Sequence, residues 1–253
     1  MLALATLAVL FFVAPLLGLL ARAPWSELGQ ALASPEVRTA LRLSAVCSGA
    51  ATLLSVVLGL PLAWVLARHP FPGRSAVRAL ATLPMILPPV VGGAALLLAF
   101  GRRGLIGQGL YAAFGIRLPF TIWGAILAET FVAMPFLVIT AEAAFRAVDQ
   151  RYEEAARSLG AGPWTAFRRV TLPLAAPALG AGTVLCWARA LGEFGATITF
   201  AGNFPGRTQT VPLQIYLLIE SGGFDQAIAL SLVLVGVSLA VLVLLRDRWT
   251  SAL

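Results

Sequence analysis

The sequence predicts an all-α polytopic membrane protein with six transmembrane helices. The 253 residues are 59% hydrophobic and only 11% charged, a balance that soluble domains do not show. Six apolar stretches are long enough to cross a bilayer, and arginine-containing polar loops separate them. These stretches are residues 1–20, 41–67, 79–100, 120–141, 177–200 and 226–245.

The charged residues exclude some classes of protein. All 18 basic residues are arginine, so the chain lacks the lysine with which a P-loop ATPase binds phosphate. The arginines that give the net charge of +7 are scattered between apolar stretches, which indicates that they contact anionic lipid and not nucleic acid. Cys47 and Cys186 lie far apart in apolar stretches, so we expect small buried thiols and no metal site.

The first two stretches differ in what they predict. Residues 1–20 are either a spanning helix or a signal peptide, because Ala21-Arg22-Ala23 resembles a cleavage site. The positive segment that begins a signal peptide is missing, so we favour a retained helix. The second stretch has small residues four apart, which predicts a close-packing stripe on one face, although chance in an Ala- and Gly-rich chain is the alternative. They are Ser44, Ser48, Ala51, Ser55, Gly59 and Ala63.

The third stretch is interrupted. Pro84, Pro88, Pro89 and the pair Gly92-Gly93 predict a broken helix. Broken helices survive in membranes where protein or a water-filled cavity satisfies the freed backbone, so we expect this one to lie centrally. The single histidine, His69, falls in the preceding loop and is expected in solvent.

Ionisable residues occur inside the later stretches. Glu129 lies in the fourth, and Arg189 and Glu193 lie four residues apart in the fifth, where they can pair on one helix face. Charges at this depth are costly and usually face a bundle interior or a cavity. Two interpretations stay open for the pair: it lines a translocation pathway, or it only fixes helix packing.

The most polar helix-compatible segment is residues 142–176. Helix-favouring residues around Glu154 are followed by Gly160, Gly162 and Pro163, then by a short helical run from Trp164 to Val170. This order predicts a helix, a tight turn and a second helix closed by Leu172-Pro173, held at the membrane surface. Such a unit can bind a soluble partner, or it is an interfacial helix without one.

The spacing within this segment matches a known motif: E-A-A, three residues, G, nine residues, I, one residue, L-P. Valine replaces the isoleucine, which is a mild departure. The segment resembles the EAA loop of binding-protein-dependent ABC importer permeases, and the resemblance implies a type I importer (MetI-like) bundle. The matching residues are Glu154, Ala155, Ala156, Gly160, Val170, Leu172 and Pro173.

The resemblance also implies partners. Two copies of the chain form the pore, two ATP-binding subunits dock on the cytoplasmic side, and an external or periplasmic binding protein delivers substrate. The chain then has no catalytic residue, metal or cofactor of its own, and ATP and Mg²⁺ belong to the ATPase subunits. The docking residues implied are Glu154, Ala155, Ala156, Arg157, Gly160, Leu172 and Pro173.

A second stretch narrows the family. The run Gly192 to Phe200, GEFGATITF, leads into Asn203 and the loop up to Pro212. It is similar to the molybdate permease branch, which implies that the substrate is molybdate or tungstate. Residues expected along the pathway are Arg189, Glu193, Thr197 and Thr199.

Other functions remain as alternatives. A permease for sulfate or another oxyanion is the closest. An ion-coupled secondary transporter would use Arg189, Glu193 and Glu129 as a relay without an ATPase. An intramembrane enzyme lacks support, because one loop histidine and no acidic or cysteine cluster make no catalytic constellation.

Arginine counts predict the orientation in the cytoplasmic (inner) membrane. Six spans place both termini on one side, together with the loop at residues 142–176. That side holds ten arginines and the other seven, so the positive-inside rule makes it cytoplasmic. We expect an N-terminal helix and loop (1–36), the permease domain (37–246) and a short cytoplasmic tail (247–253).

Overall fold

The computed structural model describes residues 1–250, with side chains through Val243, and this part of the chain is helical without strands. The predicted tail around Arg246 to Arg248 lies outside the described side chains. The helices are α1 (Leu2–Ala21), α2 (Leu28–Ala33), α3 (Pro35–Arg68), α4 (Arg74–Ile86), α5 (Pro89–Phe100), α6 (Gly107–Phe114), α7 (Ile122–Ala147), α8 (Gln150–Ser158), α9 (Pro163–Ala166), the π-helix η1 (Phe167–Thr171), α10 (Leu172–Leu191), α11 (Gly195–Phe200), α12 (Val211–Glu220) and α13 (Phe224–Thr250).

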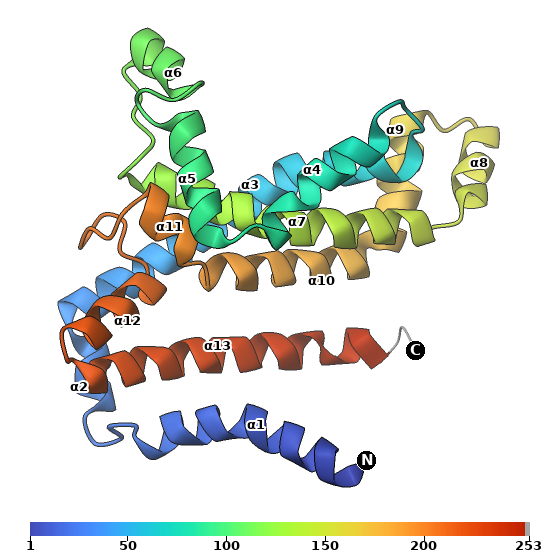
Figure 1. The fold of residues 1–253 in the computed structure, drawn as a ribbon. Helices are drawn as coiled ribbons and strands as arrows, with labels where there is room; N and C mark the ends of the chain where they lie inside the picture. Colours follow the sequence, from blue (N-terminus) through green and yellow to red (C-terminus); the bar gives the residue numbers. More distant parts are fainter. Residues whose placement is uncertain (251–253) are drawn as a thin grey trace.

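Three long helices, α3, α7 and α10, pack side by side as the centre of the molecule (Figure 1). Small residues allow this close approach: a Cβ on Gly182 of α10 would lie 2.9 Å from Thr140 of α7, and one on Gly59 of α3 would lie 3.2 Å from Val138. The small-residue stripe predicted on α3 is confirmed, since all six of its members are buried. The prediction of buried thiols is also confirmed.

Five helical segments within the described residues are long and apolar enough to cross a membrane: Leu2–Ala21, Pro35–Arg68, Ile122–Ala147, Pro163–Leu191 and Phe224–Val243. The predicted third span is two shorter helices. Leu87 between them is extended, with ψ 131°, as a following proline favours. The prediction of a broken helix is therefore confirmed.

The two halves of that broken segment have different surroundings. Helix α5 buries Gly92, Gly93 and Leu96 and packs against α11 and α7, as expected of a central element. Helix α4 buries none of its residues in this chain. Beyond α5, helix α6 extends away from the bundle (Figure 1).

The predicted fifth span is also divided. Helix α10 begins at Leu172 and ends at Leu191, and α11 begins only at Gly195. Glu193 therefore lies in a turn and not on a continuous helix face, which corrects the single span predicted at 177–200.

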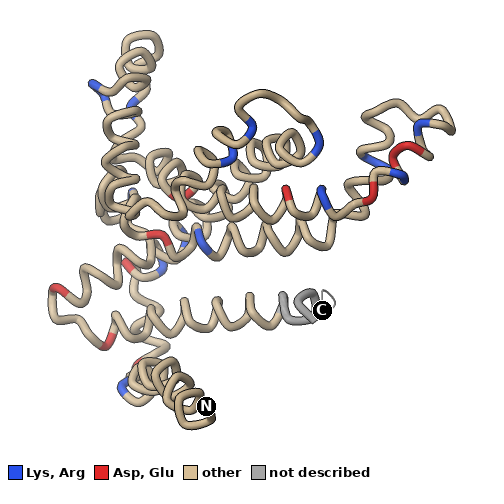
Figure 2. Tube along the Cα trace, turned by 45° about the vertical axis from the view of Figure 1, so that its right-hand side comes forward, with Lys and Arg blue, Asp and Glu red and all other residues tan. Residues whose placement is uncertain are grey.

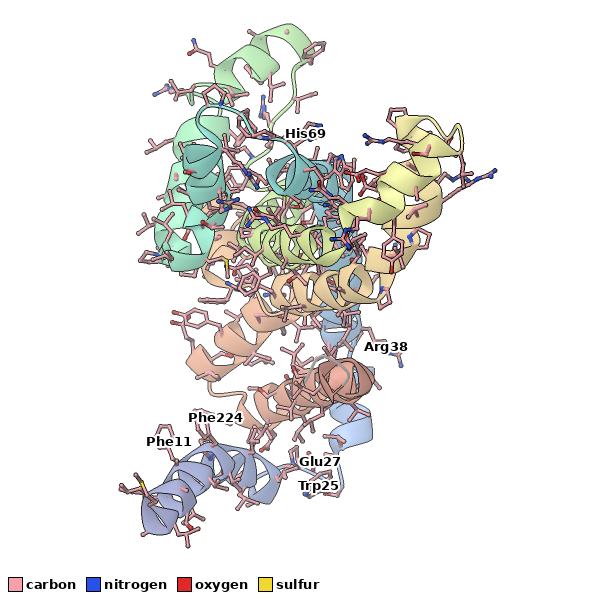
Figure 3. The ribbon with its side chains drawn as sticks, turned by 90° about the vertical axis from the view of Figure 1, so that its right-hand side faces the viewer. Phe11, Trp25, Glu27, Arg38, His69 and Phe224 are labelled. Atoms are coloured by element: carbon pink, nitrogen blue, oxygen red, sulfur yellow. The ribbon has the colours of Figure 1, made fainter. Side chains whose placement is uncertain are left out.

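Helix α1 is set apart from the bundle. It buries none of its residues and lies next to α13, as two views of the molecule show (Figures 1 and 3). Trp25 and Glu27 mark the turn that follows it (Figure 3). Such an apolar, uncovered helix is suited to contact with lipid or with another protein chain.

Candidate functional site

The loop between α7 and α10 has the helix, turn and helix order that the sequence predicts. Asp149 caps α8 by accepting the Arg151 backbone N–H at 3.0 Å. Gly160 ends this helix with φ +87°, a left-handed conformation that glycine adopts without strain. Pro163 then starts α9, as its fixed φ favours at a first helical turn.

The second helix of the loop does not close at Leu172-Pro173, contrary to the prediction. α9, η1 and α10 form one continuous helical segment from Pro163 to Leu191. The π-helix ends at Thr171, two residues before Pro173, whose ring and missing N–H disturb α-helical bonding to the turn before it. The first part of the predicted loop, from Glu142 to Ala147, likewise belongs to α7.

We name the exposed end of the molecule formed by residues 150–166 the coupling loop. Charged residues of both signs gather there (Figure 2). Of the predicted docking residues, Ala156 and Leu172 are half-buried and the others are exposed: Glu154, Ala155, Arg157, Gly160 and Pro173. The surface is thus available to another protein.

Two exposed apolar residues of the coupling loop were not among the predicted docking residues. Leu159 is 89% exposed and Trp164 is 70% exposed. Trp164 stacks on Phe167 with ring centroids 5.5 Å apart, at the edge of an apolar groove of about 540 Å³ between α9 and α3. Large exposed apolar side chains beside charged ones are typical of protein interfaces.

A buried ion pair fastens the coupling loop to the bundle. Glu153 Oε1 lies 2.9 Å from Arg68 Nη2 and accepts the Thr171 hydroxyl at 2.8 Å. Arg68, the last residue of α3, also donates to the Val148 carbonyl at 2.9 Å. This pair was not predicted, because 85 residues separate its members and no local spacing marks them.

A second buried carboxylate lies at the same end of α7. Both carboxylate oxygens of Glu142 accept the Nε–H of Arg78 in α4, each at 3.1 Å. Arg146 Nη2 lies 2.6 Å from Glu142 Oε1. This cluster joins α4 to α7. It was not predicted either, since Arg78 and Glu142 are 64 residues apart.

The predicted pair inside the membrane is present. Arg189 Nη2 lies 2.6 Å from Glu193 Oε2, and Glu193 Oε1 accepts the Ala196 backbone N–H at 2.8 Å. Glu193 is 1% exposed, so the carboxylate is enclosed and also caps the start of α11.

The other predicted membrane residues are placed differently. Thr199 donates its hydroxyl to the Gly195 carbonyl of its own helix at 2.8 Å. The buried Thr197 Oγ1 and Glu129 Oε2 have no hydrogen-bond partner among the described residues. Of the four residues predicted along the pathway, Arg189 and Glu193 pair with each other, Thr199 bonds to its own helix, and Thr197 has an unpaired hydroxyl that is fully buried.

Comparison with known proteins identifies the family. Residues 55–252 match the family described as binding-protein-dependent transport system inner membrane component. The chain belongs to this family. It is a multi-pass inner membrane permease subunit of an ABC transporter, and this subunit is not itself catalytic.

Individual relatives of this permease agree with the family. It is 48% identical over 230 residues to the molybdenum transport system permease protein ModB of Mycobacterium tuberculosis, covering 91% of this chain and 86% of the relative. It is 36% identical to the sulfate transport system permease protein CysT of Escherichia coli, covering 88% and 80%. A solved bacterial alginate ABC transporter, in complex with an alginate pentasaccharide-bound periplasmic protein, shares the fold with a TM-score of 0.73 at 19% identity, covering 98% and 93%.

Proposed function

We propose that the chain is the permease subunit of an ATP-driven importer of molybdate or tungstate. The observation that carries this proposal is the exposed coupling loop of a chain with 48% identity to a molybdenum permease. The identity to a sulfate permease is lower, at 36%, so sulfate is the second candidate within the same class.

The assembly we propose has two copies of this chain around one pathway, because a single bundle supplies only half of a symmetric pore. Two ATP-binding subunits, which hold ATP and Mg²⁺, dock on the coupling loops, and an external binding protein delivers the oxyanion. Closure of the ATPase pair brings the two coupling loops together. The helices then move as rigid bodies between inward-open and outward-open states.

The proposed orientation places the coupling loop and both termini in the cytoplasm. The start of α1 and the far end of α13 lie at the same end of the molecule as α8 and α9 (Figure 1), which supports a common side. The arginine excess on that side supports its assignment as cytoplasmic. We keep 37–246 as the permease domain, with 1–36 and 247–253 outside it.

Within the membrane, we propose that Arg189, Glu193, Thr197 and Thr199 border the pathway. The unpaired hydroxyl of Thr197 supports this assignment, because a tetrahedral oxyanion needs hydrogen-bond donors that the fold has not already used. Thr197 is 0% exposed in this conformation, so the pathway has to open for the anion to reach it. The ion pair fixes the junction between α10 and α11 beside it.

Replacement of Glu154 by lysine tests the docking assignment. The side chain is exposed, so the fold should be kept while the charge offered to the ATPase is reversed. In proteoliposomes containing the permease, its ATPase and its binding protein, we expect loaded binding protein to stimulate ATP hydrolysis and Glu154→Lys to abolish the stimulation. Molybdate should stimulate more than sulfate. Absence of any stimulation in the unmodified complex would refute the importer.

Substitution of Gly160 separates the importer from a secondary transporter. A valine at φ +87° strains the turn by about 1–2 kcal/mol and shifts α8 relative to α9. Because no atom lies within 4 Å of its Cβ position, the rest of the fold has no clash. We expect Gly160→Val to lower uptake and ATPase binding together. An ion-coupled transporter would keep its uptake rate in this variant.

A further inference from the structure

We propose that Glu153 is the positioning residue that makes the coupling loop move together with α3 and α7. The inference rests on the proposed function, in which the coupling loop receives the force of ATP-driven closure. Glu153 would hold the coupling loop to the helix bundle, whereas its neighbour Glu154 would contact the ATPase.

Glu153 joins four parts of the chain, three at its carboxylate and the fourth through Arg68. Its Oε1 binds the Arg68 guanidinium at 2.9 Å and the Thr171 hydroxyl at 2.8 Å. Arg68 in turn binds the Val148 carbonyl, one residue beyond α7, at 2.9 Å. Helix α8 is thus connected to the end of α3, the end of α7 and η1 through the side chains of Glu153, Arg68 and Thr171.

The burial of these contacts makes them stiff. Glu153 is 7% exposed, and the Arg68 and Glu153 side chains are 8% and 9% exposed in their pair. Short charge-assisted bonds shielded from water are the stronger class of hydrogen bond. By contrast, Arg157 lies 3.9 Å from Glu153 with its side chain 54% exposed, so that pair contributes little.

Helix geometry explains why two adjacent glutamates act differently. Successive residues of an α-helix point about 100° apart, so Glu153 can face the bundle while Glu154 faces outward. The structure has one buried and the other exposed. A partner that engages Glu154 therefore pulls on a helix whose inner face is fastened by Glu153.

The coupling loop is already connected to α10 by the covalent chain, because α9, η1 and α10 form one continuous helical segment. Glu153 adds the connection to α3, the 34-residue helix that packs against both α7 and α10. Displacement of α8 then moves the three central helices together. Without Glu153, α8 can move with its partner while α3 stays behind.

The test uses Glu153→Gln in the complete complex of permease, ATPase and binding protein in proteoliposomes. Glutamine keeps the shape and removes the charge. We expect the complex to assemble and basal ATP hydrolysis to stay near that of the unmodified complex, while stimulation by molybdate-loaded binding protein falls at least about fivefold, the lower range of coupling between distant sites. Uptake per ATP hydrolysed should fall in parallel.

Glu142→Gln is the matched control. Glu142 is also a buried carboxylate bound by arginines at the same end of α7, but it joins α4 to α7 and not to the coupling loop. We expect it to lower the melting temperature without lowering stimulation. Equal loss of stimulation in both variants, or full stimulation in Glu153→Gln, would overturn the proposal.

Two further outcomes are decisive. If the unmodified complex is not stimulated, the proposed function fails and this inference falls with it. If Glu153→Gln does not fold, Thr171→Val decides, because it removes one bond to the carboxylate and keeps the ion pair. Reduced stimulation in Thr171→Val supports the proposal, and unchanged stimulation rejects it.

Discussion

Arg189→Met is expected to destabilise the permease by up to about 3–5 kcal/mol, the cost of removing one partner of a fully buried ion pair, since the Arg189 side chain is 28% exposed and that of Glu193 1%. Glu193 is 1% exposed, and without Arg189 its carboxylate keeps only the Ala196 N–H. For a chain of this size, the melting temperature should fall by up to about 6–20 °C. Thermal unfolding of the purified protein in lipid nanodiscs measures this.

Two companion variants show what the pair does. Glu129→Gln is the control, because Glu129 is equally buried but its Oε2 has no partner among the described residues; it should change stability little. The double variant Arg189→Met/Glu193→Met should recover most of the stability, since well-packed apolar residues often replace a buried pair without loss. If this stable double variant still transports, the pair is structural; if it does not, the pair belongs to the pathway. An unchanged melting temperature in Arg189→Met would show that Glu193 does not depend on it.

Gly93→Val should separate α5 from α11 and destabilise the fold by about 1–3 kcal/mol or more, as overpacking does. A Cβ at this position would lie 2.6 Å from the Thr199 Cβ and 2.8 Å from the Ala196 carbonyl oxygen, and backbone cannot move aside easily. Because Thr199 belongs to the proposed pathway, uptake should fall with the melting temperature.

Gly49→Val is the matched control for Gly93→Val. Gly49 lies within α3, and nothing is found within 4 Å of its Cβ position. The valine should therefore be tolerated, with stability and uptake close to those of the unmodified permease. Similar losses in the two variants would mean that the close crossing of α5 and α11 is not what makes Gly93 necessary.

Local features of the sequence predicted much of this structure. The length and apolarity of the spans, the small-residue stripe on α3 and the turn at Gly160 are each encoded within a few neighbouring residues. The break before Pro89 was predictable for the same reason, because proline restricts its predecessor.

Features that depend on distant residues could not be predicted. The pairs of Glu153 with Arg68 and of Glu142 with Arg78 connect helices whose contact is decided only by packing. The end of α10 at Leu191 was missed because the apolar residues on both sides of Gly192 allow a single span, with Arg189 and Glu193 paired inside it. Arg189 and Glu193 do pair as predicted, but across a helix end and not along one face.

The π-helix η1 has a consequence for the direction in which the coupling loop points. Each residue of an α-helix advances the chain by about 100° around the axis, so a stretch wound more widely changes the angular phase between what precedes and follows it. η1 lies between α9 and α10 within one continuous segment. These five residues therefore set the direction in which Trp164 points around the axis of α10. A partner that fits the coupling loop thus depends on the helical geometry of η1 as well as on the surface of the loop.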